Sequence, residues 1–295
     1  TLAGGITNSG SISGSAGGVY LLNSTLSGGI DNSGTISGGT YGIVVSQSSL
    51  TDGIDNSGTI SGGGVGIYAL QSTFTGGIDN SGSISGGQYG IYALQSTLTG
   101  GINNSGTISG GTYGIFAAQS SLTGGINNSG SISGKTGIYL KSGSSLSGGI
   151  TNAGLITGTS IAGIYLNASA LDGGIGNLGT ISGGQNGIQS SRSTLTGGIT
   201  NSGSISGVTD GIFAFRSTLT DGIDNSGLIS SKTGIYLKSG STLSGGVTNA
   251  GLIQGTSVAG IYLNASALTG GIDNAGTISG GQYGIYVNNG STLAG

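Results

Sequence analysis

The side chains that could do acid, base or metal chemistry are few in this 295-residue chain. It has no His, Cys or Glu, and its nine carboxylates are all Asp. Carboxylates repeated at one outward position could bind an occasional cation, but a calcium site needs several oxygens that converge on one point. We therefore expect no specific metal site and no cofactor. The Asp residues that precede a repeated Asn are Asp31, Asp55, Asp79, Asp224 and Asp273.

Catalysis needs more than stacked carboxylates. Retaining glycoside hydrolysis uses two carboxyl groups about 5–5.5 Å apart in a cleft, with one pKa raised above the other. Stacked Asp residues could meet that distance, but nothing in the sequence separates their pKa values. The only two Arg residues, Arg192 and Arg216, occupy the same position in neighbouring units, with no Asp cluster opposite them. We expect that the protein is not an enzyme.

A single Asn recurs in each of twelve units and is the most regular polar residue. A carboxamide can donate to one neighbour and accept from the other, so stacked units would join these side chains in a ladder. Such a ladder satisfies polar groups that water cannot reach, and we interpret the Asn residues as structural. We also expect Asn to tolerate a left-handed turn, and the Gly two residues later to supply a positive φ. The predicted ladder contains Asn8, Asn32, Asn56, Asn80, Asn104, Asn128, Asn152, Asn177, Asn201, Asn225, Asn249 and Asn274.

An aromatic residue also recurs once per unit, and its parity places it on the outer face. One interpretation is stacking between neighbours, worth about 0.2–1 kcal/mol per pair. The other is a contact stripe for a sugar, a surface or a neighbouring rod. Val44 and Gln189 interrupt this column, and a second set could widen it: Tyr41, Tyr89, Tyr113 and Tyr283. The main column contains Tyr20, Tyr68, Tyr92, Phe116, Tyr139, Tyr165, Phe213, Tyr236, Tyr262 and Tyr286.

The elements that carry these residues follow from the period of the chain. A Leu, replaced once by Phe74, opens each unit, with a spacing of 24 residues nine times and 25 three times. Ile residues lie in short runs of period two, such as GIYAL at 66–70, between Gly or Asn-Ser-Gly turns. No segment has a sustained apolar period of 3.6, so we expect no helices. The sequence predicts an all-β parallel β-helix of about twelve coils, with three short strands per coil.

One coil cannot bury its own apolar face, so the coils must stack as in other repeat proteins. At about 4.8 Å per coil the stack would be a rod roughly 55–60 Å long. Crossovers between parallel strands favour a right-handed helix. A left-handed hexapeptide helix is the alternative, but apolar spacings of four, six, seven and seven residues argue against it. We expect one continuous domain over residues 1–295.

The amino-acid composition excludes several classes of binding partner. Charged residues make up 5% of the chain and the net charge is −3, so no basic stripe is available for nucleic acid. The apolar runs are too short to span a membrane. Periodic apolar residues, 34% of the chain, argue against a disordered Gly/Ser linker despite the 70 Gly. The chain shows no signal peptide and does not begin with Met, so we expect a piece of a longer protein or of a polymeric assembly.

The unit GGIxNSGxISGG, followed by GIYxxxSTLTGGI, is similar over the whole chain to repeats in passenger regions of bacterial autotransporters and related large surface adhesins. The resemblance implies a secreted β-helical stalk, often adhesive, at the cell surface. It supplies no catalytic motif to place on these positions.

The two ends of the chain, TLAG at 1–4 and TLAG at 292–295, lie in the same phase of the repeat. No Pro, charge cluster or capping helix blocks the edges there. We therefore expect either further coils or self-association end to end, with lateral bundling as a further option.

The function that these observations favour is an extracellular structural rod, a unit of a surface fibre or adhesin stalk. The alternative is an adhesin module that binds surface glycans through the outward Tyr stripe. A minor alternative is ice binding, because flat Ser/Thr arrays can order water. The faces near the Asn residues, such as Thr7, Ser9 and Ser11, are too mixed for that, and Leu155, Leu228 and Leu252 intrude.

Overall fold

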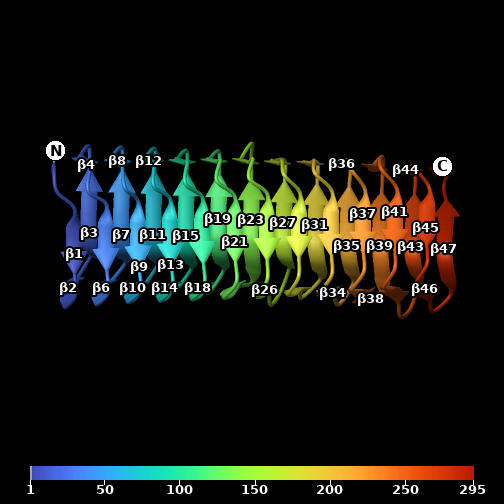
Figure 1. Ribbon diagram of the computed structural model, residues 1–295, viewed down its shortest axis with the longest axis horizontal. Helices are drawn as coiled ribbons and strands as arrows, with labels where there is room; N and C mark the ends of the chain where they lie inside the picture. Colours follow the sequence, from blue (N-terminus) through green and yellow to red (C-terminus); the bar gives the residue numbers. More distant parts are fainter. Residues whose placement is uncertain (1) are drawn as a thin grey trace.

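The computed structural model describes residues 2–295, which form a solenoid of twelve stacked coils. Figure 1 shows the coils side by side along one axis, with the N-terminus at one end and the C-terminus at the other. Strands are the only regular elements among these residues, and neighbouring strands pair in parallel. Each residue faces its equivalent in the next coil, as Ile30 faces Ile54. The predicted parallel β-solenoid is confirmed, and its right-handed sense stays a prediction.

Each coil contributes one strand to each of four sheets, rather than to the three that the sequence predicts. The first sheet carries the first Ile and the Asn of each unit. It contains β1 (Ile6–Asn8), β5 (Ile30–Asn32), β9 (Ile54–Asn56), β13 (Ile78–Asn80), β17 (Ile102–Asn104), β21 (Ile126–Asn128), β25 (Ile150–Asn152), β29 (Ile175–Asn177), β33 (Ile199–Asn201), β37 (Ile223–Asn225), β41 (Val247–Asn249) and β45 (Ile272–Asn274).

The second sheet carries the second aliphatic column. It contains β2 (Ser11–Gly14), β6 (Thr35–Gly38), β10 (Thr59–Gly62), β14 (Ser83–Gly86), β18 (Thr107–Gly110), β22 (Ser131–Gly134), β26 (Leu155–Gly158), β30 (Thr180–Gly183), β34 (Ser204–Gly207), β38 (Leu228–Ser231), β42 (Leu252–Gly255) and β46 (Thr277–Gly280).

The third sheet has the longest strands and carries the aromatic residues. It contains β3 (Gly17–Leu22), β7 (Tyr41–Ser46), β11 (Val65–Leu70), β15 (Tyr89–Leu94), β19 (Tyr113–Ala118), β23 (Thr136–Lys141), β27 (Ala162–Asn167), β31 (Asn186–Ser191), β35 (Asp210–Phe215), β39 (Thr233–Lys238), β43 (Ala259–Asn264) and β47 (Tyr283–Asn288).

The fourth sheet, which the sequence did not predict, carries the Leu that opens each unit. Its strands are two or three residues long, too short to show an alternating pattern. It contains β4 (Thr25–Leu26), β8 (Ser49–Leu50), β12 (Thr73–Phe74), β16 (Thr97–Leu98), β20 (Ser121–Leu122), β24 (Ser145–Leu146), β28 (Ala170–Leu171), β32 (Thr194–Leu195), β36 (Thr218–Leu219), β40 (Thr242–Leu243), β44 (Ala267–Thr269) and β48 (Thr292–Ala294).

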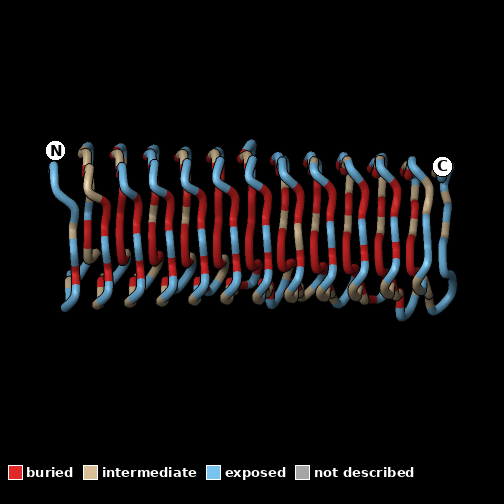
Figure 2. Tube along the Cα trace, in the orientation of Figure 1, coloured by how far each residue is buried: buried red, intermediate tan, exposed pale blue. Residues whose placement is uncertain are grey.

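The core is a set of apolar columns that run the length of the rod. In one coil, Leu26, Ile30, Ile36, Ile43 and Val45 are all fully buried. Each side chain packs against its equivalents above and below, because the pairing register repeats without a slip. Figure 2 shows that burial is continuous through the middle coils and falls away in the coil at the C-terminal end.

The Gly that follows the ladder Asn is needed for close approach, and the positive φ expected for it is wrong. Gly34 is not among the residues with positive φ. A Cβ atom added to Gly34 would lie 2.1 Å from the carbonyl oxygen of Gly10 in the preceding coil. The ladder Asn residues are not left-handed either, because they lie in strands. Gly is therefore needed in this turn because the backbones of neighbouring coils lie close together, and not because the turn requires a left-handed backbone.

Positive φ occurs instead at two other corners. Gly residues such as Gly29 and Gly53 adopt it just before the first sheet, and mostly non-Gly residues adopt it between the third and fourth sheets. Gln47, Gln71 and Gln95 there have φ values of 50°, 49° and 50°, and their side chains are exposed. We call this set the corner residues. They are Asn23, Gln47, Gln71, Gln95, Gln119, Ser142, Ala168, Arg192, Arg216, Ser239, Ala265 and Asn289.

Candidate functional site

The predicted Asn ladder is present along the whole rod. The Nδ2 of each Asn donates to the Oδ1 of the Asn in the next coil, at 2.7 Å from Asn8 to Asn32 and 2.8 Å from Asn128 to Asn152. Each interior Nδ2 also donates to the carbonyl two residues later and to a carbonyl in the next coil, as Asn80 does to Gly82 and Thr107. These amides are buried and directional, so every bond in the ladder points from N-terminal to C-terminal coils.

A second internal ladder, built from Ser, was not predicted. In most coils the Ser two positions before the Leu accepts a bond from the backbone N–H of its equivalent in the preceding coil, as Ser72 Oγ does from Ser48 at 3.1 Å. Its hydroxyl in turn donates to a nearby carbonyl, from Ser72 to Leu70 at 2.7 Å. Among the described residues the ladder is interrupted after Ser144, whose N–H donates to the carbonyl of Lys141, and after Ser241. The signal was available, because this position is Ser in all twelve units. The residues are Ser24, Ser48, Ser72, Ser96, Ser120, Ser144, Ser169, Ser193, Ser217, Ser241, Ser266 and Ser291.

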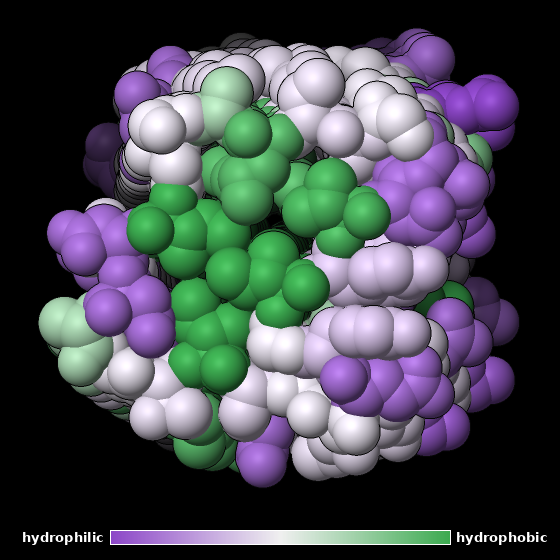
Figure 3. Space-filling view, turned by 90° about the vertical axis from the view of Figure 1, so that its right-hand side faces the viewer, coloured by the Kyte–Doolittle hydropathy of each residue, from purple (hydrophilic) through white to green (hydrophobic). Residues whose placement is uncertain are grey.

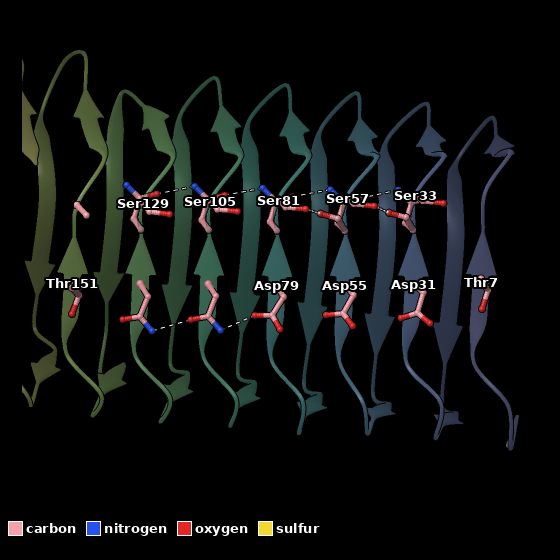
Figure 4. A pocket seen from close by; sticks show the side chains of 18 residues that line it. Thr7, Asp31, Ser33, Asp55, Ser57, Asp79, Ser81, Ser105, Ser129 and Thr151 are labelled. Carbon is pink, nitrogen blue, oxygen red and sulfur yellow. Dashed lines mark hydrogen bonds between the residues drawn. The ribbon is translucent and has the colours of Figure 1, made fainter.

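A groove of about 670 Å³ lies on the side of the rod, over the first sheet. Figure 4 shows its two parallel rows of side chains, with Asp31, Asp55 and Asp79 in one row and Ser33 and Ser57 in the other. The first row continues with amides: Asn103 donates to Asp79 at 2.6 Å and Asn127 donates to Asn103 at 2.9 Å. The Asp residues point outward as predicted, and the groove offers hydrogen-bond acceptors and donors at the spacing of the coils.

The middle Asp residue of the groove lies between two other carboxylates. Partial burial raises the pKa of Asp55, and the neighbouring carboxylates of Asp79 and Asp31 raise it further. Asp224 and Asp273 lie in other coils, outside this groove. Among residues 2–295 no group of three or more His, Cys, Asp or Glu side chains is arranged to hold a metal ion.

The aromatic residues of the third sheet stack into a nearly continuous column. Tyr139 and Tyr165 lie 4.7 Å apart with rings 3° from parallel, and Tyr236 and Tyr262 lie 4.6 Å apart at 2°. The predicted interruption at Val44 is bridged, because Tyr41 contacts both Tyr20 and Tyr68. The interruption at Gln189 remains, since among the described residues no aromatic pair joins Tyr165 to Phe213.

The column is more deeply buried in its middle than its outward position alone predicts. Phe116 and Tyr139 are each only 7% exposed, whereas Tyr20 is 42% exposed. The second set of Tyr residues causes this, because Tyr113 packs against both Phe116 and Tyr139 at about 5 Å. Burial also raises the pKa of Tyr92, Tyr113 and Tyr165. The column is a half-buried second apolar cluster, and its ends are its most accessible part.

A polar break divides the aromatic column where Gln189 stands. Ser190 takes an inward position between Leu166 and Ala214, and its buried Oγ has no hydrogen-bond partner among the described residues. In the next coil Asp210 is 4% exposed. Burial raises the pKa of Asp210 to about 6, although a hydrogen bond with Thr233 and the charge of Lys238 lower it.

Three of the six basic side chains lie beside aromatic rings. Arg216 and Arg192 place their guanidinium groups 5.1 and 5.8 Å from the ring centre of Phe215. Lys238 lies 5.9 Å from the ring of Tyr236. Arg192 and Arg216 are both corner residues, as the shared position in the sequence requires.

The fourth sheet presents a double row of hydroxyls that the sequence analysis overlooked. Ser or Thr flanks the inward apolar residue on both sides in most coils, as in Thr73-Phe74-Thr75 and Thr97-Leu98-Thr99, but Ala170 and Asp172 flank Leu171. Of these, Thr73, Thr75 and Thr99 are exposed. The triplet of hydroxyl, apolar and hydroxyl residues would have revealed this strand and its face together.

The remaining observations concern relationships and membranes. Among residues 2–295 the structure contains no helix that could span a bilayer. No family model, no curated protein and no solved structure matches the chain.

Proposed function

We propose that the protein is an extracellular, non-catalytic structural rod, a unit of a cell-surface fibre or adhesin stalk that stacks end to end. The observation that carries the proposal is the unbroken register of twelve coils, in which apolar, Asn and Ser columns all serve contacts between coils. Apart from the three carboxylates of the groove, the side chains that the coils bring together are mostly amides, hydroxyls and apolar groups, which suit a scaffold better than a reaction.

Stacking is tested by measuring mass over a concentration series with sedimentation velocity, and by imaging the same samples with electron microscopy. We expect rods whose length increases in whole multiples as concentration rises. A monodisperse monomer at every concentration would contradict the stacking part of the proposal.

The extracellular role rests on the similarity of the repeat to autotransporter-type passengers. Antibody labelling of intact cells that produce the native protein tests it. We expect labelling without permeabilisation, and labelling only after permeabilisation would exclude a surface location.

The alternative function is glycan or surface binding through the aromatic column. The aromatic residues that remain accessible favour this function most. Exposed or half-buried side chains are found at Tyr20, Tyr68, Tyr92 and Tyr165. Replacing Tyr68, Tyr92 and Tyr165 by Ser should abolish retention on immobilised polysaccharides if this function holds. Ser33→Ala and Ser57→Ala in the groove serve as a matched control, and unchanged retention in the Tyr variant would leave the column a purely structural feature.

Ice binding is the minor alternative, and the double hydroxyl row of the fourth sheet favours it more than the faces near the Asn residues. Thr residues there repeat at about 4.8 Å between coils and about 7 Å along the strand, with stiff β-branched side chains. Thermal hysteresis of the purified protein tests this function, with Thr75→Lys and Thr99→Lys as the variant that should remove it. Absence of hysteresis in the unmodified protein would exclude it.

A further inference from the structure

The C-terminal end face of the rod exposes the apolar interior of the last coil. Figure 3 views this face and shows apolar side chains gathered at its centre. Ile285 is 42% exposed and Val287 is 40% exposed, whereas their equivalents one coil earlier, Ile261 and Leu263, are fully buried. Ile272 and Ile278 line a hollow in the same face.

The N-terminal end face carries the matching columns. Ile6, Ile12 and Leu21 are only partly buried and pack on the core from this end. They belong to the same columns as Ile272, Ile278 and Val287, because the sheets keep one register from end to end. An N-terminal face placed on a C-terminal face would therefore continue every apolar column.

The two faces also end in opposite hydrogen-bonding groups. Asn8 donates to Asn32, but within residues 2–295 no group donates to its Oδ1. Asn274 accepts from Asn249 through Oδ1, and its Nδ2 donates only to Gly276 in its own coil. Within residues 2–295 the ladder thus begins with an unpaired acceptor on Asn8 and ends with a donor on Asn274 that has no partner in another coil.

We propose that the partner of the C-terminal face is the N-terminal face of a second copy of this chain, and that copies join only head to tail. This inference rests on the stacking part of the proposed function. It adds the relative direction of the stacked copies and the atoms that bond across the joint. Asn274 Nδ2 of one copy donates to Asn8 Oδ1 of the next, and parallel strand pairing continues across the joint. Two N-terminal faces would instead oppose two acceptors, and two C-terminal faces would oppose two donors.

For the stack to be continuous, the first residues of one copy must give up their position to the last residues of the other copy. Leu2–Gly4 and Leu293–Gly295 have the same sequence and occupy equivalent positions in the repeat. Leu2 pairs with Leu26 through an isolated bridge, in which its N–H donates to Thr25 and its carbonyl accepts from Ser27, so few bonds must be replaced when it is displaced. Leu293 of one copy takes the place under Leu26 of the next, and one Leu-Ala-Gly segment replaces an identical one. A contact of this heterologous kind does not close on itself and produces open filaments.

Two blocked variants test the polarity. Ile12→Lys places a charge on the N-terminal face, and Ile285→Lys places one on the C-terminal face. Each variant alone should stay monomeric, while an equimolar mixture should form dimers and nothing longer, because only one productive joint remains. Leu178→Lys, at a side position that is 67% exposed, is the matched control and should assemble like the unmodified chain. Circular dichroism confirms that each variant keeps its strands.

The outcomes separate the two proposals. If the unmodified chain never assembles, the stacking of the proposed function fails and the inference fails with it. If the unmodified chain assembles but either blocked variant dimerises alone, stacking stands and head-to-tail polarity is overturned. A mixture that stays monomeric while the unmodified chain assembles overturns the polarity as well.

A second variant tests the ladder bond itself. Asn274→Asp keeps the acceptor that Asn249 uses and removes the donor that the joint needs. We expect association about tenfold weaker or more at neutral pH, with recovery in acid as the new carboxyl group gains a proton. Association unchanged at neutral pH would remove Asn274 from the joint.

Discussion

Burial of Asp210 makes the free energy of unfolding depend on pH. Its pKa is raised by burial to about 6 in the folded rod, above the usual value of 3.8. Stability from the neutral carboxyl group is therefore fully present below about pH 4 and is lost as pH rises through about 6.

We expect Asp210→Asn to stabilise the rod at pH 7 by up to about 3 kcal/mol and to change little at pH 4. Urea unfolding at both pH values measures the difference between variant and parent. Because Asp55 also has a raised pKa, the comparison uses this difference rather than the pH profile of the parent alone. Equal effects at the two pH values would show that Asp210 titrates normally.

The Asn ladder gives a second prediction for single residues. Asn128→Ala removes the acceptor of Asn104 and the donor to Asn152 in the buried interior. Buried polar groups left without partners cost about 1–3 kcal/mol each, so we expect a loss of about 2–4 kcal/mol in unfolding free energy. The exposed neighbour Ser129 is the control, and Ser129→Ala should stay within about 0.5 kcal/mol of the parent. Similar losses for both variants would mean that the ladder adds little.

Among the elements, the turn after the first sheet is limited by the distance between coils. A Cβ atom at Gly106 would lie 2.0 Å from the carbonyl oxygen of Gly82, whereas one at Gly176 would meet nothing within 4 Å. Neither residue has a positive φ, so a left-handed backbone does not require Gly at either site.

We therefore expect Gly106→Ala to destabilise the rod by about 3 kcal/mol or more, because a backbone carbonyl held in a ladder cannot move aside. Gly176→Ala should be neutral or slightly stabilising. Thermal unfolding of the two variants decides the matter, and matching midpoints would mean that neighbouring coils can spread apart at the turn.

Elements that repeat a visible pattern were predictable from the sequence, and elements defined by contacts between coils were not. The Ile runs and the Asn column required only period and parity. The strand at Thr25–Leu26 is too short to show a period, and Ser72 resembles an ordinary turn residue until its partner Ser48 is in place. The burial of Phe116 depends on Tyr113, which comes from a different position of the unit and folds over it.

The groove shows the same limit at the candidate site. The outward direction of Asp31, Asp55 and Asp79 follows from parity. Their placement in a concave surface beside a Ser row depends on the bend of each coil after the Asn. The sequence does not predict that bend. The Gly two residues after the Asn was expected to turn the chain through a positive φ, but it is needed because neighbouring coils approach closely there.

The whole molecule behaves as a one-dimensional stack, in which each coil contacts only its neighbours. Interior coils have two partners and the end coils have one. We expect hydrogen–deuterium exchange to be slowest near Ile132 and Ile156 and fastest in the coils of Ile6 and Ile278, since end coils can open alone. Mass spectrometry of peptides along the chain measures this gradient. Uniform protection would show that the rod opens only as a single unit.

The corner residues allow different side chains to be displayed at regular intervals along the rod. Gln71, Ala168 and Arg216 have φ values of 49°, 50° and 50° although their side chains differ in size and charge. The fold therefore leaves this position chemically open while the coils fix its pitch at about 4.8 Å. Different side chains could therefore be substituted at this position in successive coils, and ligands attached to them would be separated by whole multiples of the coil spacing.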